Sequence, residues 1–320
     1  MKTKHLVYCP FTGLGLYNGF RGNRWLKNRI KIFKQFVVPS LLSQTNDNFI
    51  LWISWRREER NNPIVLQLIK YLDDIFSENQ VIHTFAGVCF YDDKYNDDEA
   101  RERLLDSIHQ SMPTLLNALG ECDYILMTIQ PSDDIYESCA FDKIQHVFEK
   151  EKSIQALGYT QGYICNYFTK VVAEYNPTTN PPFYTIKFPR EVFQDPLSHL
   201  QYTSLKVNIG KYKQGTPLPS HEYVGNCLKY RTLNGRGFMV GTHSENISTV
   251  FNHPFKGKEI AWPEDQSLLK DFGISQTTPL ILKTSLRKRI LKALPFDVQK
   301  RLRYLFGEKI WNYWYNFLRS

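Results

Sequence analysis

The first 150 residues alternate between two patterns of hydrophobic and polar positions. Short apolar runs, typical of buried strands, cover 6–9, 49–53, 80–85 and 124–129. Longer segments repeat apolar residues every three or four positions, as helices do, at 24–42, 63–76, 98–119 and 138–150. Strands separated by helices build βαβ units, so we predict an α/β fold with a mostly parallel sheet flanked by helices.

The apolar run at 124–129 leads directly into Pro131-Ser132-Asp133-Asp134. Pro131 cannot donate to a sheet ladder, so the strand should stop there and present both carboxylates at its carboxyl end, where open α/β sheets bind ligands. Adjacent carboxylates repel each other unless a cation lies between them, and a divalent metal carrying a phosphate is the usual solution. Ser-Asp-Asp is also ordinary turn chemistry, so a metal site and a solvated turn both remain open.

Basic residues begin the helix that follows the first strand. Arg24 is the residue we expect to contact phosphate, because arginine matches phosphate oxygens and a helix N-terminus attracts anions. For Lys27 and Arg29 we expect a solvated helix face. The preceding segment, 11–19, carries three glycines but does not indicate a NAD site, because the second strand ends in Ser54-Trp55-Arg56 without the required acidic residue.

The second half of the chain has a different pattern and contains several histidines. A proline-rich loop at 177–182 is followed by short strand-like runs at 183–188 and 238–241. His243 follows the last run, and a strand end can bring its imidazole to the carboxylate pair as a metal ligand. A general base could come from Asp195, His199, His221 or Glu222, which all lie in this half. We select the adjacent pair His221 and Glu222 as the candidate, because each can tune the other's proton affinity.

The basic charge of the protein is concentrated at the C-terminal end. The formal net charge is +8, and residues 281–320 account for all of it. Apolar residues recur there at helical spacing between Lys and Arg, with several Trp and Tyr, which favours an amphipathic helical tail at 284–320 on an anionic membrane surface. The alternative is a helical hairpin that packs onto the main domain. The balanced charge of the first 280 residues argues against nucleic acid as a partner.

The distribution of apolar residues and cysteines indicates the compartment. No stretch reaches the ~18 apolar residues of a membrane-spanning helix, and the N-terminal apolar run is too short for a signal peptide. Six cysteines without a Cys-x-x-Cys pair are typical of reduced, buried thiols. We expect a cytoplasmic protein, attached peripherally to the inner face of the membrane through its tail.

Residues 21–49 carry a more specific pattern. A long helix is followed by Pro39-Ser40-Leu41, then by Gln44-Thr45 and by Phe49 before the next strand. This order resembles the opening of the rhamnosyltransferase family, bacterial nucleotide-sugar-dependent enzymes with a GT-A-like fold. The resemblance covers roughly residues 1–255.

Three later motifs extend the resemblance. The family's aspartate run is matched by 131–134, its Gly-Tyr pair by 162–163, and its His-x-x-Asn-x-Ser motif by 243–248, which adds Asn246 to the candidate site. Two departures stand out: Pro131 and Ser132 replace two acids of the aspartate run, and Ile247 replaces a carboxylate of the last motif.

The resemblance implies a glycosyltransferase domain. Its expected parts are a nucleotide-sugar-binding half at 1–150, an acceptor-side half at 151–255, a connecting segment at 256–283 and the tail at 284–320. The enzyme would move a sugar, with rhamnose suggested by the family, from a nucleotide-diphosphate donor to a hydroxyl of a polysaccharide or lipid-linked glycan. The expected donor-binding residues are Arg24, Asp133, Asp134 and Asn246. Asp134, Asp133 and His243 would hold a divalent metal, Mn²⁺ or Mg²⁺.

Two other classes of function also use these features. A metal-dependent phosphotransferase or hydrolase would place a pair of aspartates at a strand end. A non-enzymatic binding module would use the basic, aromatic tail to grip nucleic acid or a membrane. Turnover of a nucleotide sugar would separate the transferase from both.

Overall fold

The computed structural model describes most of the chain, and the statements below concern these residues. They are 2–15, 22–89, 97–195, 198–199, 202, 221–243, 251–260, 266–274 and 279–282. Asn246 and the predicted tail at 284–320 lie outside them. No helix within the described ranges has the length and apolar character needed to span a membrane.

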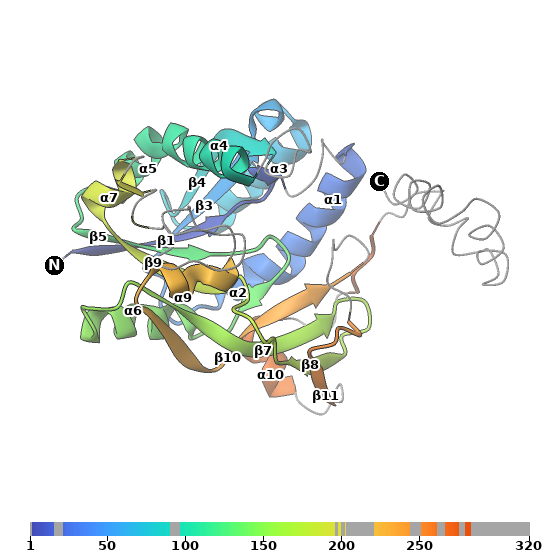
Figure 1. The fold of residues 1–320 in the computed structure, drawn as a ribbon. Coiled ribbons are helices and arrows are strands. Elements are labelled where there is room, and N and C mark those ends of the chain that lie inside the picture. Colours follow the sequence, from blue (N-terminus) through green and yellow to red (C-terminus); the bar gives the residue numbers. More distant parts are fainter. Residues whose placement is uncertain are drawn as a thin grey trace, which may run out of the picture.

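A parallel sheet forms the first half of the fold, as predicted (Figure 1). Its strands are β1 (Thr3–Cys9), β3 (Ile50–Arg56), β4 (Val81–Cys89) and β5 (Tyr124–Ile129). They lie in the order β5-β1-β3-β4, and every neighbouring pair is parallel. The two-residue strand β2 (Leu14–Gly15) pairs with the end of β4. All four main strands therefore present their carboxyl ends at one edge.

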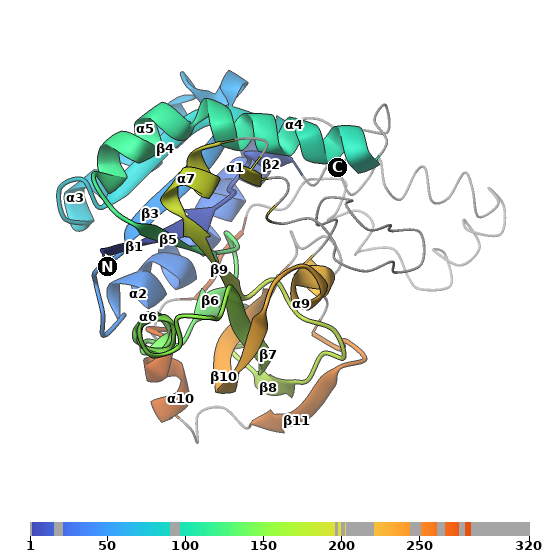
Figure 2. The same ribbon diagram turned by 60° about the vertical axis from the view of Figure 1, so that its left-hand side comes forward.

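Helices cover both faces of this sheet (Figure 2). One face carries α1 (Gly22–Ile32), α2 (Val38–Leu42), α3 (Pro63–Ile75) and α6 (Ala140–Lys150), whose apolar side chains form one buried cluster with Val7, Leu51 and Ile53. The other face carries α4 (Asp97–Gln110) and α5 (Met112–Leu119), which pack with Leu6, Tyr8 and Trp52 in a second cluster. Alternate residues of β1 thus enter opposite clusters, as the period of a strand requires.

The second half extends the same sheet with antiparallel strands. The strands are β6 (Ile135–Tyr136), β7 (Ala156–Asn166), β8 (Val172–Tyr175), β9 (Tyr184–Pro189), β10 (Tyr230–Thr242) and β11 (Lys256–Ile260). Strand β9 lies between β5 and β7 and is antiparallel to both, whereas β10 is parallel to β7. The α/β class is confirmed, but the expectation of a mostly parallel sheet holds only for the first half, and the complete sheet is mixed.

Short helical elements complete the second half and the loop after β3. They are α7 (Arg190–Gln194), α9 (Val224–Cys227), α10 (Gln266–Asp271) and two 3₁₀ turns, Arg57–Glu59 and His221–Tyr223. Both predicted halves contribute strands to the one sheet, and β11, from the predicted connecting segment, pairs with β8. The division into functional halves stays a prediction.

The helix predicted at 24–42 contains a π-helical turn at Phe33–Val37, between α1 and α2. Val38 N–H reaches back five residues to the Phe33 carbonyl. Pro39 follows in the first turn of α2, and a proline removes one helical hydrogen bond and crowds the carbonyl four residues earlier. The wider turn before Pro39 accommodates this. Such turns are frequent at functional sites, and this one directs Phe36 toward the cluster described next.

Candidate functional site

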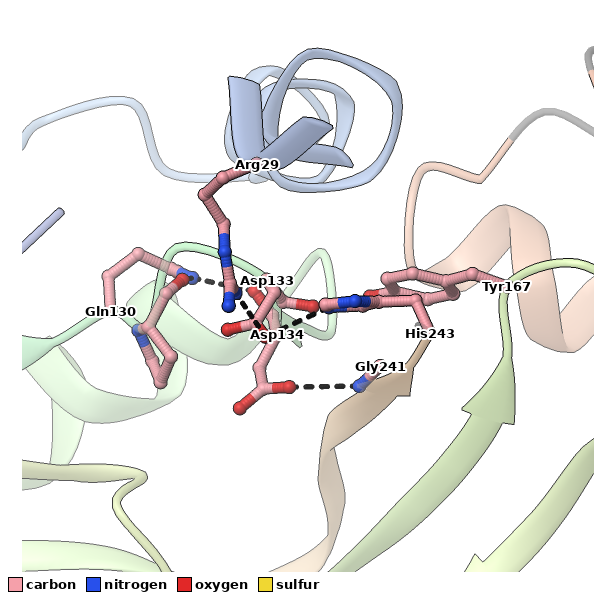
Figure 3. Close-up of polar contacts among 8 residues, drawn as sticks. Arg29, Gln130, Asp133, Asp134, Tyr167, Gly241 and His243 are labelled. Atoms are coloured by element: carbon pink, nitrogen blue, oxygen red, sulfur yellow. Dashed lines mark hydrogen bonds and ion pairs between the residues drawn. The ribbon is translucent and has the colours of Figure 1, made fainter. Parts of the chain in front are cut away.

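The loop after β5 has a fixed shape. Gln130 is fully buried, and its side-chain amide donates to the carbonyl oxygens of Pro131 and Asp134, both at 2.8 Å. β6 follows at once and pairs with β10, with Ile135 opposite Met239. This pairing brings Gly241, near the end of β10, and His243, the residue directly after β10, to the two aspartates (Figure 3).

Asp133 lies between an arginine and a histidine. Arg29, from α1, forms an ion pair with Oδ2 of Asp133, and His243 Nε2 donates to the same oxygen at 3.0 Å (Figure 3). The Asp133 side chain is 16% exposed, whereas Arg29 is 5% and His243 0% exposed. Burial alone would raise the pKa of Asp133, but the Arg29 charge and the His243 hydrogen bond outweigh it and hold the pKa well below its usual range. Asp133 is therefore an anion at neutral pH.

Asp134 has a different environment, although it is the next residue. It is buried, and its Oδ1 accepts a hydrogen bond from the Gly241 N–H at 2.9 Å. Burial, and then the negative charge of Asp133, raise the pKa of Asp134 well above its usual value; the Gly241 N–H and Arg29 oppose this only in part. The two carboxyl groups thus divide their roles. Asp133 is a charged group beside other ionisable side chains, and Asp134 fastens the end of β10.

A column of rings holds His243 and Asp133 in place. The Tyr167 hydroxyl donates to the Asp133 carbonyl oxygen at 2.8 Å. The Tyr167 ring stacks on the Phe36 ring, with centroids 3.6 Å apart. It is also nearly parallel to the His243 ring, with centroids 6.2 Å apart. Tyr167 is fully buried. The π-helical turn therefore supports the site through Phe36.

The structure confirms some sequence expectations about the basic helix and corrects one. Lys27 is exposed, as expected. The expectation that Arg29 lies on a solvated face is wrong, because its side chain is buried and it is the arginine that reaches Asp133. Arg29 follows Trp25 by four residues and precedes Phe33 by four, and both are buried, so helical periodicity places it on the buried stripe. Arg24 lies half-buried in the first turn of α1, and its donor-binding role stays a prediction.

His221 and Glu222, the candidate general base, lie beside the loop that follows β8. His221 Nδ1–H donates to the Asn180 carbonyl, and Glu222 accepts a hydrogen bond from the Thr179 hydroxyl at 3.4 Å. Burial lowers the pKa of His221, which favours a neutral imidazole. Glu222 is exposed. Their role as base is untested by these contacts and stays a prediction.

Three residues of the site escaped the sequence analysis. Arg29 could have been found from its position on the apolar stripe of its helix. Gln130 directly follows a buried strand, which is a weak signal. Tyr167 gave no signal, because only the turn between β7 and β8 brings it to Asp133, 34 residues away in sequence.

The arrangement of Asp133, Asp134 and His243 can be compared with that of a metal-ligand set. Asp133 Oδ2 is engaged by Arg29 and by His243, and Asp134 Oδ1 by Gly241. Within the described part of the chain, no group of three or more His, Cys, Asp or Glu side chains is placed to hold a metal ion. As arranged, these side chains form an ion-paired cluster rather than a metal-ligand set. Metal binding by Asp133, Asp134 and His243 stays a prediction.

We expect the two aspartates to change protein stability with pH in opposite directions. The folded pKa of Asp133 is lowered, so its stabilising effect is present above the unfolded value of about 3.9 and is lost as pH falls through the folded pKa. The folded pKa of Asp134 is raised, so its effect is present below about 3.9 and is lost as pH rises through the folded pKa. Asp134→Asn keeps an oxygen that can accept from the Gly241 N–H, but it cannot ionise. The variant should therefore not lose stability as pH rises through the folded pKa of Asp134.

Urea unfolding of the wild type and Asp134→Asn from about pH 4 to 8 measures this effect. The free energy of unfolding of Asp134→Asn, relative to that of the wild type, should increase as pH rises. Asp142→Asn, at an exposed position of α6, is the matched control. A constant difference between wild type and Asp134→Asn across this range would mean that burial does not raise the pKa of Asp134.

Comparisons with known proteins give only partial likenesses. No protein-family model and no curated protein matches the chain. Among solved structures, residues 1–349 of S. aureus TarS align with 77% of this chain and 62% of that chain, at 10% identity and a TM-score of 0.39. The same TarS fragment in complex with UDP gives the same coverage, 11% identity and a TM-score of 0.34.

A longer TarS structure aligns with 76% of this chain and 37% of that chain, at 10% identity and a TM-score of 0.33. This chain therefore spans less than two thirds of the TarS chains that it matches.

Proposed function

We propose that the protein is a glycosyltransferase that moves a sugar from a nucleotide-diphosphate donor to a hydroxyl of a polysaccharide or lipid-linked glycan. The observation that carries the proposal is the cluster of Arg29, Asp133 and His243 at the carboxyl end of β5. Ligands of open α/β sheets bind at this edge. The family resemblance of residues 1–255 supports the same function and suggests rhamnose as the sugar.

The charges of the cluster suit the reaction. The bond between the sugar and the diphosphate breaks, the acceptor oxygen bonds to the sugar carbon, and the departing diphosphate gains negative charge. A fixed positive charge near this group lowers the barrier, especially in a site shielded from water. Arg29 stays charged at any physiological pH and is held in place by Asp133. The acceptor proton goes to a base, for which His221 with Glu222 is the candidate.

Donor recognition is assigned to groups around the same cluster. The Asp133 side chain, which is 16% exposed, can accept hydrogen bonds from hydroxyls of the donor, and Arg24 and Asn246 are the further candidates from the sequence. A divalent cation would add charge compensation for the diphosphate, but no step here depends on it. Attachment of residues 284–320 to an anionic membrane surface, where a lipid-linked acceptor would be met, remains part of the proposal.

Binding of nucleotide diphosphates tests the proposal directly. A diphosphate that binds only the folded protein should stabilise it by about 2.7 kcal/mol at a hundredfold excess over its dissociation constant. The melting temperature is measured with UDP, GDP and dTDP, each with manganese and with excess chelator. Stabilisation that persists in chelator would mean that Arg29, without a metal, compensates the negative charge of the diphosphate. Stabilisation only with manganese would support the predicted metal.

Turnover then separates the classes of function. A transferase consumes a nucleotide sugar in the presence of acceptor and releases the nucleoside diphosphate. Release of inorganic phosphate without acceptor would support a phosphotransferase or hydrolase instead. If no nucleotide diphosphate or nucleotide sugar is bound or consumed, the proposed function is wrong.

A further inference from the structure

A cavity lies beside β4, which is three strands away from β5 in the parallel sheet. Its volume is about 680 Å³, which is within the range of small-molecule sites. The described lining comes from the segment just after β3, the middle of β4, and the junction of α4 and α5. Figure 2 shows α4 and α5 beside β4. The lining residues are Arg57, Arg60, His83, Thr84, Phe85, Ala86, Gln110, Ser111 and Thr114.

The cavity has a positive lining. Arg57 and Arg60 both contribute, and none of the described lining residues is acidic. Arg57 donates to the side-chain oxygen of Gln110, and the Arg60 guanidinium lies over the Phe85 ring, 5.6 Å from its centroid. The nearby carboxylate of Glu58 is within 3.5 Å of Arg56, which does not line the cavity. Neither lining guanidinium is neutralised by a carboxylate among the described residues.

His83 adds a hydrogen-bond donor, because Trp55 fixes the tautomer of its ring. The Trp55 indole N–H can only donate, and it lies 3.1 Å from His83 Nδ1, so Nδ1 accepts and Nε2 carries the proton. Burial lowers the pKa of His83 to about 4, so the ring is neutral at physiological pH. Within the described part of the chain, the buried Nε2 has no hydrogen-bond partner. A buried donor without an acceptor is costly, and its retention calls for an explanation.

These features share one requirement, an anionic ligand that is rich in acceptor oxygens. Guanidinium groups match phosphate oxygens in charge and geometry. The exposed Thr114 hydroxyl, together with the side-chain amide of Gln110, can bind hydroxyl groups beside the phosphate. We propose that this cavity binds a phosphorylated small molecule, with Arg57 and Arg60 on the phosphoryl group and His83 Nε2–H as a further donor.

This cavity is separate from the cluster at Asp133. No residue is shared between them. Strands β1 and β3 stand between β4 and β5, which separates the two strand ends by about 14 Å at the usual spacing of strands. In addition, α5 packs on the face of the sheet opposite to α1. The inference therefore stands independently of the proposed transfer reaction.

Calorimetric titration of the full chain tests the site. The probes are orthophosphate, pyrophosphate, ribose 5-phosphate and glucose 1-phosphate, with unphosphorylated ribose and glucose as controls. At least one phosphorylated probe should bind saturably, and the free sugars should not bind. The Arg57→Ala/Arg60→Ala variant should lose at least tenfold in affinity, and His83→Phe should also weaken binding. Arg56→Ala removes a neighbouring guanidinium, at the end of β3 and outside the cavity, and should stay within twofold of the wild type.

Two results would overturn the inference. One is the absence of saturable binding of every phosphorylated probe to the wild type. The other is binding that the Arg57→Ala/Arg60→Ala variant retains while Arg29→Met loses it, because the anion would then occupy the Asp133 cluster. Melting curves verify that each variant is folded. Both arginines are exposed enough for their loss to leave the fold intact.

Discussion

Replacing Arg29 by methionine should lower the free energy of unfolding by about 3–5 kcal/mol and abolish sugar transfer. The substitution leaves the Asp133 carboxylate largely buried beside His243 without its arginine. Removal of one partner from a buried ion pair is costly because the other charge keeps its desolvation penalty. Asp133→Asn should also destabilise the protein, since the buried Arg29 then loses its carboxylate.

The double variant Arg29→Met/Asp133→Asn separates stability from function. With both charges removed, most of the lost stability should return, whereas transfer should stay abolished because the charged cluster is gone. Urea unfolding at pH 7 and a nucleotide-sugar turnover assay measure the two effects. Lys27→Met, at an exposed position of the same helix, is the control and should change neither. If the double variant is as unstable as the sum of the single losses, the two residues do not interact energetically.

Gly241→Ala should destabilise the protein by about 1–3 kcal/mol and sharply weaken nucleotide-diphosphate binding. A Cβ at this position would overlap two ring carbons of Tyr167 and the carbonyl oxygen of Asp133. Neither neighbour can move easily. The Tyr167 ring is fully buried and stacked on Phe36, and its hydroxyl binds the Asp133 carbonyl. Relief of the overlap must displace the end of β10, which carries His243.

Gly225→Ala provides the matched control. A Cβ there would meet Tyr230 at 3.6 Å, an ordinary contact, and the position lies in α9. A glycine-to-alanine change in compatible backbone reduces the entropy of the unfolded chain and is neutral or stabilising. Thermal unfolding and diphosphate titration of both variants measure the contrast. An unchanged melting temperature for Gly241→Ala would mean that the approach of β10 to Tyr167 is looser than described.

The local pattern of the sequence predicted the first half of the fold well. Strand β5 has the predicted bounds, and β1, β3 and β4 lie where short apolar runs indicated. Each of these runs is buried on both faces of a parallel sheet, so its hydrophobicity does not depend on which strand lies beside it. Pro131 likewise marked the strand end, and with it the position of Asp133 and Asp134, from chain chemistry alone.

The second half shows where local pattern fails. Strand β7 was not predicted, because Gly158, Gln161 and Gly162 interrupt its apolar residues and glycine weakens a strand signal. The structure gives the reason for Gly162: a Cβ there would overlap the ring and the carbonyl of Phe238 on the paired β10. The residue that obscures the strand in the sequence is the one that allows the two strands to pair.

The sequence by itself determined that a pair of carboxylates ends a buried strand and that a basic helix follows the first strand. It could not determine which arginine meets which aspartate, because helical periodicity defines a buried face but not the residue opposite it. Asp133 and Asp134 are chemically identical neighbours, yet the pKa of one is lowered and that of the other raised. Only the tertiary structure made this difference, by placing Arg29 and His243 at the first and by burying the second beside the charge of the first. The free energy of an ionised group depends on the charges and solvent around it, and here these come from α1 and β10, each about a hundred residues away in sequence.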